Sequence, residues 1–247
     1  MKNVESWKPS KYVRRGGRLF ASRDVREVGV ASRLIANLIA ARYDTALPAH
    51  ARGRLLDLGC GKVPLYASYK DLITECTCVD WVNTAHKNDH LDYECDLSQP
   101  LPFADGAFDS IILSDVLEHI PNPEALWREM TRTLAIGGKL IVNVPFFYWL
   151  HEEPHDYYRY TEFALRRFVA LSDLTLISLE SIGGTPEVLT DFIAKHVVRI
   201  PFLGPPFAAS MQALTSFFLR TRWGMAVSRA TGRRFPLGYF LVAQKSG

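Results

Sequence analysis

The sequence has little of what secreted, membrane-spanning or disordered chains depend on. Its 247 residues include only four cysteines, all in the first half and without a Cys-x-x-Cys pair, which excludes a disulfide framework and a zinc knuckle. No apolar run opens the chain, so we expect no signal peptide. Hydrophobic residues make up 48% and charged residues 22%, as in ordinary globular proteins. We therefore expect a cytoplasmic protein.

One sign of charge is missing from a long stretch of the chain. From residue 192 to the end there is no Asp or Glu, and eight Lys and Arg give a charge of +8. Residues 1–26 carry +6, whereas residues 27–191 carry −11. This asymmetry predicts a basic N-terminal arm or lid at 1–26, followed by one domain over 27–247. A helical, basic and apolar insertion is expected at 186–235 within that domain.

Short apolar segments alternate with helical ones along most of the chain. A strand at 54–58 breaks into glycines, and a helix is expected over 123–135 between Asn122 and the pair Gly137-Gly138. Such alternation is typical of an α/β fold with a doubly wound parallel sheet. Further strands are expected near 74–79, 90–95, 110–114, 139–145, 174–180 and 239–243.

The residues that follow the first two strands predict a ligand site. Gly59 and Gly61 let the backbone approach a ligand closely, and Asp80 after the second strand can accept hydrogen bonds from both hydroxyls of a ribose. A nicotinamide dinucleotide fold uses the same plan, but its third glycine would fall on Pro64. A glycine turn with a purely structural role is the alternative.

An ordered series of motifs resembles one enzyme family. The series consists of Leu55-Leu56-Asp57-Leu58-Gly59-Cys60-Gly61, Val79-Asp80, Cys95-Asp96-Leu97, Pro102 to Asp109, and Ser114-Asp115-Val116-Leu117-Glu118-His119. It is similar to class I S-adenosylmethionine-dependent methyltransferases of the type 11 group, from about Leu55 to Pro145. The resemblance implies a Rossmann-like sheet with an antiparallel last strand, and S-adenosyl-L-methionine as the cofactor.

The resemblance also implies roles for particular residues. The methionine part would lie against the first turn, the ribose against the end of the second strand, and the adenine against the third, with the sulfonium beside the fourth. Many members have a third glycine where this chain has Val63. The implied cofactor residues are, in the same order, Asp57, Gly59, Cys60 and Gly61; Asp80 and Trp81; Asp96 and Leu97; and Ser114, Asp115 and Val116.

Methyl transfer to a hydroxyl needs a base, and histidines follow the fourth and fifth strands. His155, oriented by Asp156, is the first candidate, and His119 is the second. The surrounding aromatic segment is expected to bind substrate through Tyr148, His151, Tyr158 and Arg159. The alternative is that this segment is a packing scaffold in which Arg159 merely pairs with Asp156.

The run His151-Glu152-Glu153-Pro154-His155 matches the His-Glu-x-x-His pattern of zinc peptidases. Those enzymes need the motif inside a helix, which Pro154 opposes. A divalent ion held by His151, His155 and Asp156 in another geometry is an open alternative, but we predict no metal.

The sequence gives less information about the methyl acceptor and the binding partners than about the cofactor. The segment from His151 to Thr161 resembles a type 11 subgroup common among polysaccharide and glycolipid enzymes, so we expect O-methylation of a glycan or glycolipid precursor. Methylation of a soluble small metabolite and a catalytically inactive cofactor-binding protein are the alternatives. The apolar run Ile200–Leu219 with its flanking arginines predicts peripheral contact with an anionic membrane, or else a helical cap or dimer interface. No motif supports nucleic-acid binding.

Overall fold

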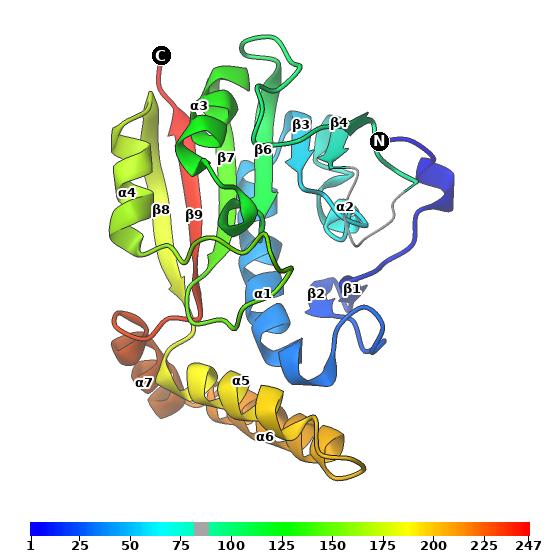
Figure 1. Ribbon diagram of the computed structural model, residues 1–247, viewed down its shortest axis with the longest axis vertical. Helices are drawn as coiled ribbons and strands as arrows, with labels where there is room; N and C mark the ends of the chain where they lie inside the picture. The colour runs from blue at the N-terminus through cyan, green and yellow to red at the C-terminus, as the bar shows by residue number, and fades with distance from the viewer. Residues whose placement is uncertain (82–88) are drawn as a thin grey trace. The chain divides into compact units, whose positions relative to one another are not determined.

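The computed structural model describes residues 1–81 and 89–247, and the chain forms two compact units (Figure 1). One unit comprises Met1–Pro9, Thr45–Glu180 and Tyr239–Gly247, and the other comprises Ser10–Asp44 and Ser181–Gly238. Each unit has a buried apolar cluster of its own. No helix among the described residues is both long and apolar enough to cross a membrane.

The first unit is built on a seven-stranded sheet. In the sheet the strand order is β5-β4-β3-β6-β7-β9-β8. The pairs β3–β4, β4–β5, β3–β6 and β6–β7 are parallel, and β9 runs against its neighbours (Figure 1). The expected α/β fold with an antiparallel last strand is thus confirmed. The strands are β3 (Gly53–Leu58), β4 (Ile73–Asp80), β5 (Tyr93–Glu94), β6 (Phe108–Ser114), β7 (Leu134–Pro145), β8 (Leu174–Ile182) and β9 (Gly238–Lys245).

Helices α3 (Pro123–Thr133) and α4 (Glu162–Ala170) cover one face of this sheet (Figure 1). Their side chains Trp127, Met130 and Leu165 belong to the same buried cluster as Leu56 and Leu113 from the central strands. The central strands are nearly continuous apolar runs because a parallel sheet is buried on both faces. The remaining short elements of this unit are α2 (Tyr66–Tyr69) and the 3-10 turns Val4–Ser6 (η1) and Leu117–His119 (η3).

The position of β3 in the sheet determines where a ligand can bind. β3 lies between β4 and β6, and its last residue, Leu58, pairs in register with Leu113 of β6. The two strands therefore end side by side at the point where the order of the sheet changes direction. Ligands of open α/β sheets bind in the crevice at such a switch point.

Helix α3 ends two residues earlier than the sequence predicts. Its start is as expected, since Asn122 Oδ1 accepts a hydrogen bond from the Ala125 N–H at 3.3 Å. Its end is not set by Gly137-Gly138, because β7 already begins at Leu134, which pairs with Phe108 of β6. Pairing between strands thus overrides the local helix-ending signal.

The second unit contains a β-hairpin in the segment that the sequence predicts as a basic arm. Strands β1 (Tyr12–Arg15) and β2 (Arg18–Ala21) pair antiparallel around Gly16 and Gly17, whose φ angles are +55° and +77°. A two-residue hairpin turn with both φ angles positive favours glycine, so the Gly-Gly pair was a usable signal. A lid role for residues 1–26 stays a prediction.

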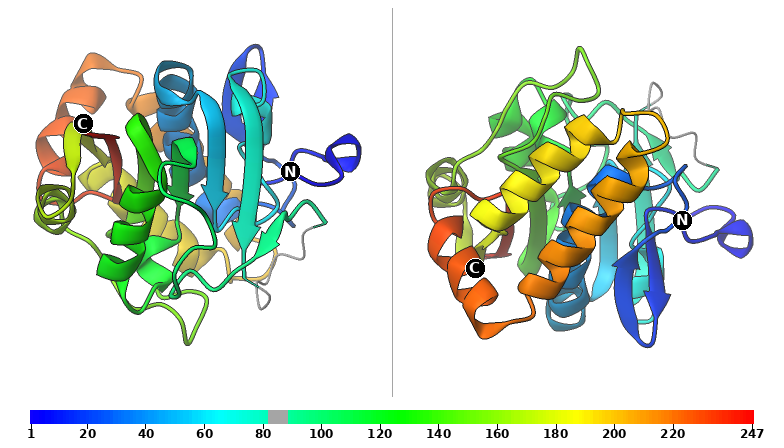
Figure 2. Two further views of the ribbon diagram at one scale, coloured as in Figure 1. Left: turned by 90° about the horizontal axis from the view of Figure 1, so that it is seen from above. Right: turned by 90° about the horizontal axis from the view of Figure 1, so that it is seen from below.

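The expected helical insertion before the last strand is confirmed. Helices α5 and α6 lie side by side (Figure 2), and the hydroxyls of Thr190 and Thr215 hydrogen-bond at 2.7 Å between them. A further helix, α1, continues through Pro48. The bounds are α1 (Arg33–His50), α5 (Thr185–Val197), α6 (Gly204–Phe218), α7 (Arg222–Gly232) and the 3-10 turn Val30–Ser32 (η2).

Helix α6 buries its small and polar side chains and exposes large apolar ones. Gly204, Ala208 and Gln212 are buried, whereas Phe207 is 55% and Leu214 is 70% exposed. A Cβ on Gly204 would lie only 2.0 Å from the Val197 carbonyl oxygen, so the close approach of the chain requires glycine there. The apolar stripe is consequently left on the outside.

The side chain of Gln212 joins α6 to the start of α1. Its Oε1 accepts a hydrogen bond from the Leu34 N–H at 2.7 Å, and its Nε2 donates to the Val30 carbonyl at 2.6 Å. Both backbone groups belong to the first turns of a helical segment, where no partner within the helix is available to the Leu34 N–H. The buried amide satisfies a donor and an acceptor at once.

We predict that Gln212→Leu destabilises the protein by about 2–4 kcal/mol, because it leaves the Leu34 N–H and the Val30 carbonyl buried without their partner. Urea unfolding followed by circular dichroism measures the change. Gln99→Leu, at an exposed glutamine, is the control and should change stability by less than about 0.5 kcal/mol. Equal stability of the two variants would contradict the bridging role of Gln212.

Candidate functional site

The turn after β3 is held by backbone hydrogen bonds and by one carboxylate. Gly59 has a φ of +65°, and a Cβ there would lie 2.4 Å from Val116 Cγ2, so no other residue fits without displacement. Asp80, at the end of β4, accepts hydrogen bonds from the N–H groups of Gly61 at 2.9 Å and Trp81 at 2.8 Å. The turn thus connects the ends of β3, β4 and β6.

Val63 occupies the place where the resembling family often has a third glycine. Its φ angle is +51°, a conformation that is strained for a β-branched residue, which explains why glycine is common there. The side chain is fully buried, and the Val63 carbonyl accepts a hydrogen bond from Trp7 Nε1 at 3.1 Å. Packing and this contact hold the strained turn in place.

Asp57 is a buried carboxyl group beneath this turn. It is 4% exposed, and Tyr69 Oη donates a hydrogen bond to its Oδ2 at 2.9 Å. Burial, opposed by the Tyr69 hydrogen bond and reinforced by the charge of Asp80, raises the pKa of Asp57 to about 7. The group therefore changes its charge near neutral pH.

The other expected cofactor residues follow the neighbouring strands. Asp96 is exposed after β5, and its Oδ1 accepts hydrogen bonds from the N–H and Oγ of Ser98 at 2.9 and 2.7 Å, while Leu97 is buried. After β6, Asp115 has a φ of +54° and its N–H donates to the Asn143 carbonyl at 2.9 Å. Cys60 is a buried thiol in the first turn.

The carboxylates at the strand ends suit a cofactor that has ribose hydroxyls. Each oxygen of Asp80 accepts a backbone N–H, and a carboxylate at this position is the type of group that accepts hydrogen bonds from ribose hydroxyls. The residues that would hold S-adenosylmethionine are therefore brought to one edge of the sheet, within a single unit.

The segment after β7 is tied back to the 3-10 turn that follows β6. The N–H groups of Tyr157 and Tyr158 donate to the Glu118 carbonyl at 2.9 and 3.2 Å, and Tyr160 Oη donates to the Leu117 carbonyl at 2.9 Å. Tyr158 Oη also donates to the Pro121 carbonyl at 3.0 Å. These bonds fix residues 155–160 beside the end of β6.

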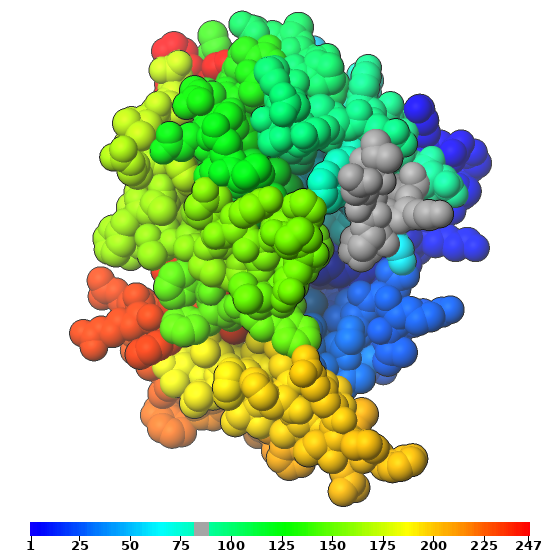
Figure 3. Space-filling view, viewed as in Figure 1, coloured from blue at the N-terminus to red at the C-terminus, as the bar shows by residue number. Residues whose placement is uncertain are grey.

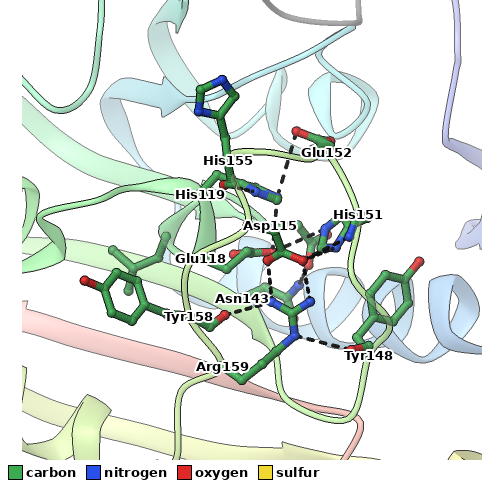
Figure 4. Close-up of polar contacts among 12 residues, drawn as sticks. Asp115, Glu118, His119, Asn143, Tyr148, His151, Glu152, His155, Tyr158 and Arg159 are labelled. Atoms are coloured by element: carbon green, nitrogen blue, oxygen red, sulfur yellow. Dashed lines mark hydrogen bonds and ion pairs between the residues drawn. The ribbon is translucent and has the colours of Figure 1, made fainter.

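Asp156 and Arg159 form an ion pair at the centre of that segment. Figure 4 shows Arg159 with its polar contacts. Arg159 Nη2 donates to Asp156 Oδ2 at 2.7 Å, and the guanidinium also donates to the carbonyls of Tyr148, Trp149 and Tyr158. Burial alone would raise the pKa of Asp156, but the hydrogen bonds and charge of Arg159 and the N–H of His151 hold it at about 2. The three guanidinium nitrogens thus already donate within the segment, and a substrate-binding role for Arg159 stays a prediction.

The orienting contact that the sequence suggests for Asp156 is made with a different histidine. Asp156 Oδ2 accepts the His151 N–H at 2.9 Å and lies 3.3 Å from His151 Nδ1. His155 instead packs edge-on against the Trp81 ring at 5.0 Å, and its Nδ1 lies 3.3 Å from Tyr157 Oη. Within the described residues, His155 is therefore beside the end of β4 and not paired with Asp156.

The sequence analysis did not single out Glu118, which lies close to the rings of both His119 and His151. Its side chain is fully buried, and neither oxygen has a hydrogen-bond partner on another residue that the structure describes. Its Oε1 is 3.8 Å from His119 Nε2 and 3.9 Å from His151 Nε2 (Figure 4). Burial, with the charge of Asp115, raises the pKa of Glu118 well above its ordinary value. The Leu-Glu-His run was the available signal, but it cannot show that the carboxylate turns inward.

The imidazole rings of His119 and His151, which lie near Glu118, also contact each other and the segment after β7. His119 Nδ1 lies 2.9 Å from the His155 carbonyl, and the His119 and His151 rings meet edge to face at 4.7 Å. Tyr148 packs against His151 from the other side at 5.1 Å. Burial and the neighbouring His119 lower the pKa of His151, so the His151 ring is neutral at pH 7.

The sheet order, the glycine turn and the acids at the strand ends define a class I, Rossmann-like methyltransferase fold. Residues 56–142 match the family described as a methyltransferase domain, which confirms the resemblance to the type 11 group. Over 115 residues the chain is 30% identical to a ubiquinone biosynthesis O-methyltransferase of Xanthomonas oryzae pv. oryzae. That match covers 42% of this chain and 46% of the relative, so the chain spans about half the length of the curated relatives it matches.

Solved structures share the fold at low identity. The geranyl diphosphate C-methyltransferase of Streptomyces coelicolor, a structure with S-adenosyl-L-homocysteine, aligns with a TM-score of 0.54 and 13% identity over 87% of this chain and 82% of that one. The cyclase SpnF aligns with a TM-score of 0.55 and 19% identity over 96% and 87%. One architecture thus serves a methyltransferase and a cyclase, so the reaction has to be argued from the site.

We predict that Asp57→Asn stabilises the protein more at high pH than at low pH. A pKa raised from 3.8 to about 7 means that the folded state binds a proton that the unfolded state releases, so stability falls as pH rises from about 4 to 7. Asparagine removes this dependence. The difference in unfolding free energy between variant and wild type should grow by about 2 kcal/mol from pH 5.5 to 8, measured by urea unfolding. Tyr69→Phe, which removes the O–H that favours the charged carboxylate, should move the pH dependence upward. A difference that does not change with pH would contradict the assignment.

Proposed function

We propose that the protein transfers the methyl group of S-adenosylmethionine to a hydroxyl oxygen of its acceptor. The observation that carries this proposal is the convergence, at one edge of the sheet, of the Gly59–Gly61 turn and Asp80 with the histidine segment after β7. The contact between Trp81 and His155 connects the two groups directly. The O-methyltransferase name of the Xanthomonas oryzae relative supports an oxygen acceptor.

The chemistry is an in-line displacement at the methyl carbon. S-adenosylmethionine supplies a sulfonium-bound methyl group; an O–C bond forms while the C–S bond breaks, and its electron pair remains on sulfur. The proton of the acceptor hydroxyl has to leave, and the His155 imidazole is the proposed base. The proposed roles of Asp57, the glycine turn and Asp80 are to hold the methionine and ribose parts, so that the acceptor meets the methyl group in line.

For the acceptor we propose a glycan or glycolipid precursor, as the resemblance of the His151 to Thr161 segment suggests. Aromatic side chains around His151, including Tyr148 and the 45% exposed Tyr157, suit stacking on a sugar or other ring. A soluble small molecule remains the alternative acceptor. Transfer to lipid-linked sugars with no turnover of free phenols or sugars would favour the first.

We predict that His155→Ala retains affinity for S-adenosylhomocysteine but lowers methyl transfer by about 10²–10⁴-fold, because it removes only the base. Asp80→Asn should weaken that affinity at least about tenfold, because it removes a charged acceptor. Calorimetry and transfer of labelled methyl groups to an acceptor panel measure the two effects.

The outcomes separate the alternatives. Unchanged turnover in His155→Ala would overturn its role as the base. Wild type that binds the cofactor product but methylates nothing in the panel would favour the inactive binding protein. No binding of S-adenosylhomocysteine by the wild type would contradict the methyltransferase proposal as a whole.

We also propose that α5, α6 and their connection rest on an anionic membrane surface. Each helix carries an exposed apolar stripe, and the connection adds Phe202 and Leu203, which are 94% and 74% exposed. The yellow and gold side chains of this region lie at the surface in Figure 3. Arg199 in the connection and Arg220 and Arg222 after α6 are exposed, whereas Glu187 and Asp191 of α5 are buried, so the exposed charge here is basic and complementary to acidic head groups. The exposed stripes are Leu189, Phe192 and Ile193 on α5, and Phe207, Leu214 and Phe217 on α6.

We predict that Phe202→Ser with Leu203→Ser lowers binding to vesicles of mixed phosphatidylglycerol and phosphatidylcholine at least about tenfold, because the apolar contact is lost. Cosedimentation measures the binding, which should also weaken with salt. The control is Phe163→Ser on α4, which removes an equally apolar side chain that is 74% exposed in the other unit. Equal loss in the control, or no vesicle binding by the wild type, would contradict a membrane surface here.

A further inference from the structure

Three potential metal-ligand atoms meet beyond the ends of β6 and β7. Glu118 Oε1, His119 Nε2 and His151 Nε2 all lie within 4.8 Å of one another. Two of the residues come from the turn after β6 and the third from the segment after β7, 32 positions away in the chain. This set differs from the combination of His151, His155 and Asp156 that the sequence suggests, because His155 lies against Trp81.

The hydrogen bonds of the two rings settle which nitrogens carry protons. His119 Nδ1 lies 2.9 Å from the His155 carbonyl oxygen, which can only accept, so Nδ1 is the protonated nitrogen. His151 Nδ1 lies 3.3 Å from the Trp149 carbonyl and 3.3 Å from Asp156 Oδ2, which are acceptors as well. In a neutral imidazole the other nitrogen, Nε2, then carries a lone pair.

Two imidazole lone pairs and a buried carboxyl group therefore face one another. His119 Nε2 and both Glu118 oxygens are buried and have no hydrogen-bond partner on another described residue. The separations of 3.8 and 3.9 Å are too long for a proton shared between carboxyl and imidazole. Such an arrangement is stable when a cation lies at its centre.

From this geometry we infer that Glu118, His119 and His151 bind a divalent transition-metal ion. Two imidazoles and one carboxylate are a ligand set that suits zinc, manganese, iron or cobalt, whereas magnesium and calcium prefer oxygen alone. Ligand atoms around one zinc ion lie about 3.3 Å apart, so the two separations from Glu118 Oε1 to the imidazoles would shorten by about half an ångström and the third, between the imidazoles, by at most about 1.5 Å. Three protein ligands leave at least one coordination position open.

The groups that hydrogen-bond to the proposed ligands are also of the kind found around metal sites. Metal-binding histidines donate their second N–H to a carbonyl or a carboxylate, as both rings do here. The Arg159–Asp156 pair in turn fixes the position of His151 through its N–H. The charges of Asp115 and Asp156 act on this site against the single charge of Arg159, and Glu152 Oε2 lies 3.9 Å from His119 Nε2, which favours a cation.

The metal site itself is independent of the reaction, but its role rests on the proposed function. The His155 segment, where the acceptor is proposed to bind, contacts this site through the His155 carbonyl, which lies 2.9 Å from His119 Nδ1. A cation there lowers the pKa of a neighbouring hydroxyl and so helps the acceptor oxygen to lose its proton to the base. The acceptor class that this favours is one with an ionisable hydroxyl.

Titration of the chelator-treated protein with Co²⁺, followed by visible absorption, tests the site directly, and Zn²⁺ then competes for it. The expected result is one ion per chain. His151→Ala and Glu118→Gln should each weaken Co²⁺ binding by more than about 100-fold. His155→Ala is the matched control: it lies outside the ligand set, keeps the carbonyl that holds His119, and should bind Co²⁺ as wild type does.

Two further measurements separate the loss of metal binding from a loss of folding and from a failure of the cofactor site. Glu118→Gln replaces a buried carboxyl group that has no hydrogen-bond partner on another described residue with a neutral amide of similar size, so the melting temperature without metal should be close to that of the wild type, which shows that lost binding is not lost folding. Affinity for S-adenosylhomocysteine should be unchanged in every variant, so failure of the metal site is distinguishable from failure of the cofactor site. Failure of the wild type to bind Co²⁺ or Zn²⁺ at micromolar concentration, or unweakened binding by Glu118→Gln or His151→Ala, would overturn the proposal.

Discussion

The parallel pairing of β3 with β6 is the constraint on which the rest of the site depends. Because Leu58 and Leu113 lie in register, both strands end at the same level of the sheet. The turn after β3 then meets Val116 so closely that residue 59 has to be glycine. The same pairing leads the chain from Val116 directly into the 3-10 turn that carries Glu118 and His119. The cofactor-binding edge of the sheet and the start of the segment that carries Glu118 and His119 thus both depend on the register between β3 and β6.

The segment between β7 and α4 is held by many hydrogen bonds, although it contains no helix or strand. Arg159 and Asp156 hold it through hydrogen bonds to three carbonyls and one N–H, and Tyr160 fastens its end to the turn after β6. Such a framework keeps His151 and His155 apart, with one ring facing Glu118 and the other facing Trp81. The two histidines therefore have different surroundings and different proposed roles.

The second unit packs its helices closely, with a small buried apolar cluster between them. Its helices approach one another through small and polar residues, and Gln212 supplies the hydrogen bonds that the start of α1 lacks. Because close packing uses Gly204 and Ala208, the large apolar side chains of α6 have no place inside. Their exposure, beside a region without acidic residues, is the physical basis for proposing a membrane surface.

The sequence by itself determined the order of strands and helices, the mostly parallel sheet and the acids and glycines at the strand ends. These depend on local signals: apolar runs, the Asn122 cap and the glycine turn act within a few residues. Only the tertiary structure decided that Asp156 orients His151, that Glu118 turns inward, and that α6 faces outward with its phenylalanines. Those features depend on contacts between segments far apart in the chain, where burial and hydrogen-bond geometry, rather than local preference, select the arrangement.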